Sequence, residues 1–265
     1  MPNEASYSDI QTNPRIGDRG LINIYIPKGK GPFPFILGIH GGGWCAGDRT
    51  SYNHFWPRIK RAGIAFVLCS YRICQEDYYP AAYNDLVHLL KWLRSNGHSY
   101  SLDTERCALL GGSAGGHLVM LLATKAVREE TELCEIRAAV NYCGIMDMAE
   151  QFRYDNVRGH TMTFAFMGGN PSRKPENYID ASPVNHIHNN MPPIWMAHGA
   201  DDKIVPIAQS RNMASLLKKV GNEIKYIEAE GRGHTLIKED NAPLDKVEFL
   251  FENDMLTFVN THLKA

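Results

Sequence analysis

Gly111-Gly112-Ser113-Ala114-Gly115 is the stretch that decides the fold of this 265-residue chain. It follows a short apolar run, 107–110, and precedes a segment with apolar residues at helical spacing, 114–127. A G-x-S-x-G pattern between a strand and a helix is typical of a sharp turn that lifts the serine oxygen out of the backbone. Ser113 would lie at a helix N-terminus, where amide donors and the helix dipole favour negative charge. Ser113 could instead only cap the helix, but the motifs below favour a nucleophile.

Strand-like and helix-like segments alternate on both sides of this turn. Several of the strand-like runs are almost wholly apolar, as expected for strands that are covered on both faces. Repeated strand–helix units predict the α/β class, with a mostly parallel sheet and helices on both faces. We expect strands at 21–26, 35–40, 64–70, 107–110, 138–143, 194–197 and 224–228, and helices at 80–95, 114–127, 207–220 and 244–263.

One stretch, 144–192, breaks this alternation. It has no clean periodicity and contains several glycines, prolines, asparagines, phenylalanines and methionines. A long connection inside a compact domain is usually functional, often a lid or a wall of a pocket. Short helices packed against the core are the other interpretation, and the two are compatible. Since no linker or internal repeat is visible, we expect one domain, 1–265, that carries 144–192 as a lid-like insertion.

A second glycine-rich motif, His40-Gly41-Gly42-Gly43-Trp44, follows a strand of the buried type. Glycines let a backbone pass close to a substrate, and backbone N–H groups can stabilise the oxyanion that develops in acyl transfer. We predict that the amides of Gly42, Gly43 and Ala114 form this oxyanion hole. His40 fits a loop-fixing role better than a catalytic one. No G-K-[ST] follows the glycines, so a phosphate-binding loop is excluded.

Two further motifs complete the set. Asp201 and Asp202 follow the expected strand 194–197, and His234 follows the strand 224–228 in a glycine-flanked loop. A histidine there can serve as base and then as acid, with an aspartate that orients it. Residue chemistry alone does not choose between the two aspartates. The chain order serine, aspartate, histidine is the one that α/β-hydrolases use.

These motifs together, HGGGW, GGSAGGH, HGADDKIVP and GRGH, resemble the hormone-sensitive-lipase-like esterases. Within that group the chain is similar to a short carbohydrate-esterase and feruloyl-esterase subgroup. The resemblance implies an α/β-hydrolase fold, no cofactor and Asp202 as the acid, which makes Ser113, Asp202 and His234 the catalytic triad. Since only about 20 residues precede the first expected strand, no N-terminal helical cap is expected. The pocket would then be shaped mainly by 144–192.

The expected activity is hydrolysis of small carboxylic esters with an acetyl or compact aromatic acyl group, and the alcohol could be a sugar. An arylformamidase-type amidase or a peptidase would use the same triad. The histidine–glycine loop of arylformamidases usually reads closer to HGGYW than to the HGGGW of this chain, which favours an esterase. A non-catalytic binding protein on a hydrolase scaffold is the alternative of another class. Such proteins typically lose a triad residue, whereas all three are present here.

Charge and cysteines limit the remaining possibilities. A net charge of −1 gives no field for nucleic acid or anionic membranes, so a small molecule is the expected partner. Six cysteines without CxxC spacing argue against a zinc site or a disulfide framework, and reduced thiols in a cytoplasmic protein are expected. The first residues show no signal-peptide pattern, and no apolar run approaches the roughly 20 residues that span a bilayer.

Overall fold

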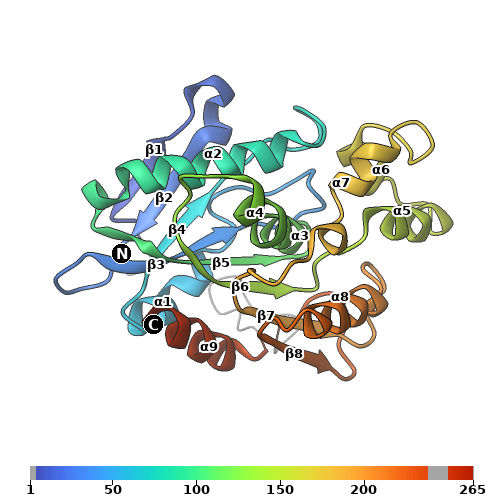
Figure 1. Ribbon diagram of the computed structural model, residues 1–265. Helices are drawn as coiled ribbons and strands as arrows, with labels where there is room; N and C mark the ends of the chain where they lie inside the picture. Colours follow the sequence, from blue (N-terminus) through green and yellow to red (C-terminus); the bar gives the residue numbers. More distant parts are fainter. Residues whose placement is uncertain (1–3, 238–249, 265) are drawn as a thin grey trace.

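The structure is a computed structural model that describes residues 4–237 and 250–264. Within these residues an eight-stranded sheet has the order β1-β2-β4-β3-β5-β6-β7-β8 (Figure 1). Strands β3 to β8 are mutually parallel, whereas β2 pairs antiparallel with β4 and β1. The mostly parallel sheet is therefore confirmed. The strands are β1 (Tyr7–Gln11), β2 (Leu21–Tyr25), β3 (Phe33–Ile39), β4 (Ala65–Cys69), β5 (Leu102–Gly112), β6 (Ile136–Tyr142), β7 (Ile194–Gly199) and β8 (Ile224–Ala229).

The first strand, β1, corrects the expectation that the sheet begins near residue 21. Four of its five residues are exposed, and Asp9 has a left-handed φ of 54° where the register with β2 shifts. An irregular edge strand of this kind has neither an apolar run nor a clean alternation of apolar and polar residues, so the sequence pattern does not predict it. Fewer residues therefore precede the sheet than the sequence pattern indicates.

Helices cover both faces of the sheet, as predicted (Figure 1). One apolar core joins one face to α2 (Ala81–Asn96), α3 (Ala114–Leu121) and α8 (Ile207–Lys219). A second core joins the other face to α1 (Trp56–Arg61) and α9 (Glu252–Lys264). The helix expected at 114–127 is continuous but contains a π-helical turn, Leu122–Ala126, before α4 (Val127–Glu129). Of the helix expected at 244–263, residues 244–249 lie outside the described residues.

The stretch 144–192 forms three short helices, α5 (Met148–Val157), α6 (Met162–Met167) and α7 (Pro175–Asp180), which gather at one side of the molecule (Figure 1). The short-helix interpretation is therefore confirmed. Asp147 caps α5 by accepting the N–H of Glu150, and Gly168 ends α6 in the left-handed conformation, φ 64°. Short 3-10 turns lie at Pro14–Gly20, Asn53–Phe55, Gly97–Tyr100 and Pro183–His186.

Parallel strands bring the predicted motifs to a common edge. The carboxyl ends of β3, β5, β7 and β8 lie on the same side of the sheet because these strands run in one direction. The loops that follow them start at His40, Ser113, Ala200 and Glu230. Ligands of open α/β sheets bind outside the carboxyl ends of the strands. The fold therefore collects all four motifs where such a site is expected.

Candidate active site

Ser113 occupies the turn between β5 and α3 with φ 55° and ψ −125°, a conformation that non-glycine residues rarely adopt. Its own N–H donates to the carbonyl of Tyr142, 2.8 Å away on the neighbouring strand β6. The flanking glycine is required by space: a Cβ on Gly115 would lie 2.1 Å from the carbonyl oxygen of Ile39. The sheet thus holds the serine in the strained turn that the motif predicts.

The structure brings Ser113, His234 and Asp202 together. His234 Nε2 lies 2.9 Å from Ser113 Oγ, and His234 Nδ1 lies 2.7 Å from Asp202 Oδ2. The Asp202 side chain is fully buried, whereas Asp201 is exposed to solvent. Of the two aspartates that the sequence left open, only Asp202 contacts the histidine. The three side chains thus form one hydrogen-bonded chain of the kind that joins a nucleophile, a base and an orienting carboxylate.

The Asp202 carboxylate accepts hydrogen bonds on both oxygens. The backbone N–H groups of Ile204 and Val205 donate to Oδ1 at 2.8 and 3.0 Å. His234 and His198 face Oδ2 at 2.7 and 3.1 Å. Burial alone would raise the pKa of Asp202, but these hydrogen bonds outweigh it and hold the pKa well below its ordinary value. The group therefore stays ionised across the physiological pH range.

The glycines of the second motif present free backbone donors. Gly42 has φ +110° and Gly43 has φ +60°, and a Cβ on Gly42 would lie 2.4 Å from the carbonyl of Ala46. Within the described residues, the N–H groups of Gly42, Gly43 and Ala114 donate to no other protein group. Ala114 is the first residue of α3, where backbone N–H groups have no partner inside the helix. These three amides are thus available to an oxyanion.

Two buried histidines fix the loop after β3 that carries Gly42 and Gly43, which we call the oxyanion loop. His40 stacks on Tyr71, with ring centroids 4.1 Å apart, and its Nδ1 donates to the carbonyl of Gly41 at 2.8 Å. His117 of α3 accepts the indole N–H of Trp44 at 3.2 Å and donates through Nε2 to the carbonyl of Ala181 at 2.7 Å. Burial lowers the pKa of each ring to about 4, so both are neutral at pH 7. The loop-fixing role expected of His40 agrees with these contacts.

A cavity of about 350 Å³ opens beside Ser113. None of its described lining residues belongs to 144–192, so this segment does not form the wall of the cavity beside Ser113 that the sequence analysis expects of it. Met162 of α6 packs against the glycine-rich loop: a Cβ placed on Gly43 would lie 2.3 Å from its Sδ. The cavity is lined by Gly41, Gly42, Gly47, Ser51, Tyr52, Gly112, Ser113, Tyr142, His234, Thr235 and Leu236.

Tyr52 is a site residue that the sequence analysis missed. Its hydroxyl oxygen accepts the N–H of Gly112, the residue directly before Ser113, at 2.9 Å. Burial raises the pKa of this phenol to about 12, so it remains a neutral wall of the cavity. Tyr52 lies in a loop without a recognisable motif, and no pattern in the sequence would have found it.

A second hollow of about 610 Å³ lies between Cys45 of the oxyanion loop and α6. Two aromatic side chains that line it, Tyr78 and Phe164, are about half exposed. Its lining residues are Cys45, Cys74, Gln75, Tyr78, Thr161, Phe164, Ala165 and Gly168. The segment 144–192 thus forms a wall of this hollow through α6 and its flanking residues.

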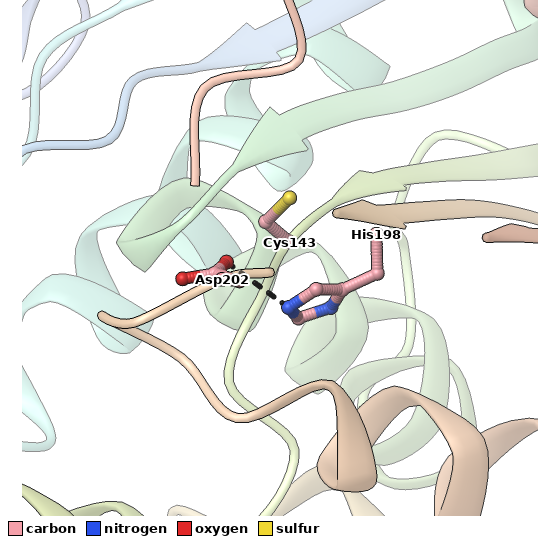
Figure 2. Close-up of side chains that lie close together, drawn as sticks. All are labelled: Cys143, His198 and Asp202. Atoms are coloured by element: carbon pink, nitrogen blue, oxygen red, sulfur yellow. Dashed lines mark ion pairs between the residues drawn. The ribbon is translucent and has the colours of Figure 1, made fainter. Parts of the chain in front are cut away.

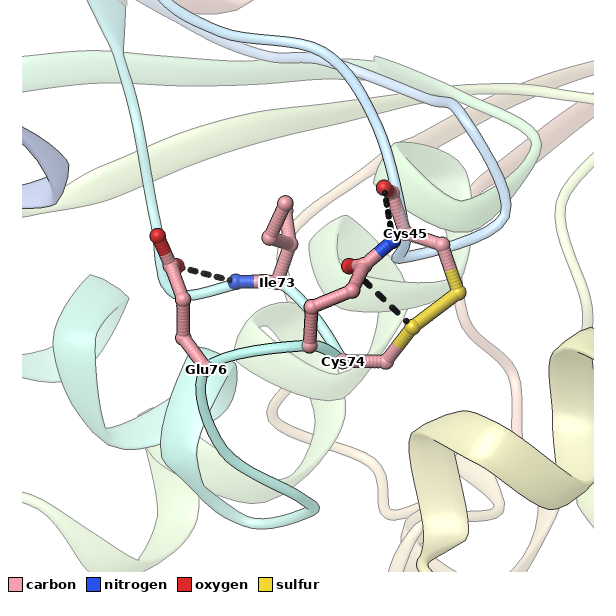
Figure 3. Close-up of a disulfide and its surroundings, with 5 residues drawn as sticks. Cys45, Ile73, Cys74 and Glu76 are labelled. Atoms are coloured by element: carbon pink, nitrogen blue, oxygen red, sulfur yellow. Dashed lines mark hydrogen bonds between the residues drawn. A yellow bond between two sulfur atoms is a disulfide. The ribbon is translucent and has the colours of Figure 1, made fainter.

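The oxyanion loop is tied down by a disulfide between Cys45 and Cys74 (Figure 3). The expectation of six reduced thiols is therefore wrong for this pair, while Cys69, Cys107, Cys134 and Cys143 are free and buried. The adjacent strands β3 and β4 bring the loops that follow them to a Cα–Cα distance of 5.0 Å. Gln75 adds a hydrogen bond from its side-chain amide to the carbonyl of Cys45, 2.9 Å away.

We expect a Cys45→Ser, Cys74→Ser double variant to lose about 3–4 kcal/mol of unfolding free energy, because the bridge closes a loop across 29 positions. Equilibrium urea unfolding of the two proteins measures this difference. Thiol titration of the denatured, unreduced wild type is the control and should count four thiols. A count of six, or equal stability of the two proteins, would contradict the assignment.

Among the described residues, one group of possible metal ligands lies close together: Cys143, His198 and Asp202, whose ligand atoms are within 4.8 Å of one another (Figure 2). Burial raises the pKa of the Cys143 thiol, which keeps it protonated. Both ring nitrogens of His198 and both oxygens of Asp202 already have hydrogen-bond partners. This donor set fits a hydrogen-bonded support for the carboxylate and does not fit a metal centre.

The eight-stranded sheet and the turn at Ser113 define an α/β-hydrolase. The profile of the BD-FAE family matches residues 22–217. The chain therefore belongs to the BD-FAE family, within the esterase group of the α/β-hydrolases. A truncated form of a carbohydrate esterase from gut microbiota shares the fold, with a TM-score of 0.84 and 22% identity over 100% of this chain and 99% of that one.

Two curated relatives come from Mycobacterium tuberculosis. The probable carboxylic ester hydrolase LipM is 29% identical over 206 residues, 73% of this chain and 47% of LipM. Esterase LipC is 27% identical over 221 residues, 80% of this chain and 55% of LipC. The chain thus spans about half the length of these relatives. Within residues 4–237 and 250–264, every helix is too short or too polar to cross a lipid bilayer.

Proposed function

We propose that the chain is a serine esterase that hydrolyses small carboxylic esters. The observation that carries this proposal is the chain of hydrogen bonds from Ser113 Oγ to His234, 2.9 Å, and from His234 to the buried Asp202, 2.7 Å. It lies beside a cavity and beside three amides that have no other partner among the described residues. The names of the curated relatives, a carboxylic ester hydrolase and an esterase, support the same class of reaction.

The reaction proceeds in two halves. His234 Nε2 takes the proton of Ser113 as Oγ attacks the ester carbonyl carbon, and the amides of Gly42, Gly43 and Ala114 stabilise the oxyanion. The carbonyl re-forms, the carbon–oxygen bond to the alcohol breaks, and His234 gives its proton to the leaving oxygen. Water, deprotonated by His234, then attacks the acyl-serine and releases the acid and Ser113. Asp202 keeps the imidazole in the tautomer with its proton on Nδ1.

The acyl group is small, an acetyl or a compact aromatic acid. A cavity of about 350 Å³ is at the lower end of ordinary ligand pockets. The rings of Tyr52 and Tyr142 and the side chain of Leu236 line it and give an apolar surface for such a group. A long alkyl chain would need more apolar lining than the described residues of this cavity provide.

The alcohol half is a sugar hydroxyl, and the second hollow, which includes Cys45 two residues after Gly43, is the surface that we assign to the rest of the sugar. The half-exposed rings of Tyr78 and Phe164 offer apolar faces there, with Gln75 and Thr161 as polar groups between them. The structural neighbour described as a carbohydrate esterase supports this assignment. The alcohol would then be larger and more polar than the acyl group.

A series of p-nitrophenyl esters tests the proposal. We expect kcat/KM to be highest from acetate to butyrate and about tenfold or more lower for decanoate, because the excess methylenes find no pocket. An acetylated sugar should also be hydrolysed, whereas N-formylkynurenine, an amide substrate, should not. A maximum beyond about eight carbons would refute the small acyl group, and faster cleavage of N-formylkynurenine than of phenyl acetate would refute the esterase assignment.

A further inference from the structure

His198 is a buried histidine that the proposed mechanism does not use. It is the next-to-last residue of β7 and is four positions before Asp202, and its side chain has no exposed surface. Figure 2 shows its ring pointing from the strand toward the Asp202 carboxylate. Most buried ring nitrogens have hydrogen-bond partners, and the partners of His198 define what it does here.

The hydrogen on Nε2 is determined by its neighbours. Nε2 lies 3.0 Å from the carbonyl oxygen of Val205 and 3.1 Å from Asp202 Oδ2. A backbone carbonyl only accepts hydrogen bonds, and the Asp202 carboxylate is ionised, so it too only accepts. Nε2 therefore carries the hydrogen and donates to both oxygens.

The other nitrogen then needs a donor. Nδ1 lies 2.7 Å from the hydroxyl oxygen of Ser210, which is 1% exposed on α8. A neutral ring with its hydrogen on Nε2 has a free acceptor at Nδ1, and the Ser210 hydroxyl fills it. In this tautomer both ring nitrogens have a hydrogen-bond partner.

The contact between His198 Nε2 and Asp202 Oδ2 affects the base, because it acts on the same oxygen that binds His234. Asp202 Oδ2 is the oxygen that accepts the Nδ1–H of His234, while Oδ1 is held by the amides of Ile204 and Val205. With two donors on each oxygen, the carboxylate cannot rotate without breaking a hydrogen bond. Of these four contacts, the one from His198 comes from a strand of the sheet, and the others come from the acid loop and the base. The Cys143 thiol, which directly follows β6, is a further hydrogen-bonding neighbour of the carboxylate.

We propose that His198 is a positioning residue that holds the Asp202 carboxylate in line with His234, and that Ser210 fixes the ring tautomer this requires; the inference rests on the function proposed above. Through these hydrogen bonds, His198 of β7 and Ser210 of α8 help to position His234 by way of Asp202. Neither residue lines the cavity, so their effect is on the rate of chemistry and not on substrate binding.

Two substitutions at one position test the inference. His198→Leu removes the donor, and we expect kcat for p-nitrophenyl acetate to fall about 10- to 100-fold, as for misplaced catalytic groups, with KM within about threefold. His198→Gln places an amide N–H near the position of Nε2 and should recover most of the lost kcat. The low-field proton resonance of the His234–Asp202 hydrogen bond should shift or broaden in the leucine variant and return in the glutamine variant.

The controls separate positioning from stability and from the proposed function. Met213→Ala truncates a buried side chain of α8 that makes none of the hydrogen bonds to Asp202 or His198, so it should lower stability and leave kcat unchanged. Ser113→Ala is measured alongside: if it keeps wild-type hydrolysis, the proposed function fails, whatever His198 does. If Ser113→Ala is inactive and a folded His198→Leu keeps wild-type kcat and resonance, or if glutamine rescues nothing, the inference is overturned.

Ser210→Ala keeps the test decisive if His198→Leu does not fold. Loss of the hydroxyl leaves Nδ1 without a donor and the tautomer unfixed, so kcat should fall several-fold at unchanged KM, with a shifted low-field resonance. A folded Ser210→Ala with wild-type kcat and an unshifted resonance would overturn the tautomer argument.

Discussion

Ser113→Ala is expected to lower kcat for p-nitrophenyl acetate by about 10⁶-fold, as loss of the nucleophile does in other triad enzymes. The physical reason is that alanine has no oxygen to form the acyl intermediate, while His234, Asp202 and the three amides remain in place. Removal of one hydroxyl from a strained turn should leave the sheet intact, so circular dichroism and thermal unfolding should resemble those of the wild type. Steady-state hydrolysis over a range of enzyme concentrations measures the loss.

Ser51→Ala is the matched control for this variant. Ser51 lines the same cavity, but its oxygen accepts the N–H of Asp48 at 3.2 Å and makes no hydrogen bond to His234. We expect its kcat to stay within about tenfold of the wild type. If a folded Ser113→Ala kept a tenth of wild-type turnover, Ser113 would not be the nucleophile and the proposed mechanism would be wrong.

Asp202→Asn is expected to lower kcat by about 10⁴-fold, since an amide in place of the carboxylate favours the wrong tautomer of the base. The amide can donate to His234 Nδ1, which moves the ring hydrogen to Nε2 and removes the acceptor that Ser113 needs. The volume of the side chain hardly changes, so the loss reports the hydrogen bond and not the packing. Hydrolysis of p-nitrophenyl acetate at several pH values measures it.

Asp201→Asn provides the matched control one residue away. Asp201 is exposed, and its backbone N–H, not its carboxylate, bonds to the carbonyl of Arg232 at 2.8 Å. Its replacement should change kcat by no more than a few-fold. Equal losses in the two variants, or a larger loss at Asp201, would contradict the assignment of the acid.

Much of the candidate site could be predicted because its chemistry needs rare local patterns. The turn at Ser113 requires small neighbours. A Cβ on Gly115 would lie 2.1 Å from a backbone oxygen, so this position must be glycine, and the sequence pattern reveals the turn. The choice between Asp201 and Asp202 could not be made from residue types. It depends on a turn in which the Asp202 carboxylate binds the amides two and three residues on.

The features that were missed depend on distant parts of the chain. The Cys45–Cys74 bridge joins two loops 29 positions apart that only the pairing of β3 with β4 brings together. Tyr52 reaches the nucleophile turn across 60 positions through one hydroxyl. The walls of the pocket depend on how the loops fold over the edge of the sheet. The pattern of residues in 144–192 does not predict this arrangement. Local patterns thus predict the reacting groups better than their surroundings.

The most direct test of the central claim is covalent capture of the nucleophile by a p-nitrophenyl alkylphosphonate. Attack of Ser113 Oγ on phosphorus would form the oxygen–phosphorus bond, release p-nitrophenolate, and pass the serine proton to His234. Intact-mass and peptide analysis should find one phosphonyl group per chain, on Ser113, with activity lost in proportion and no adduct on Ser113→Ala. An adduct on another residue that abolishes activity, or full esterase activity in protein phosphonylated at Ser113, would contradict the account.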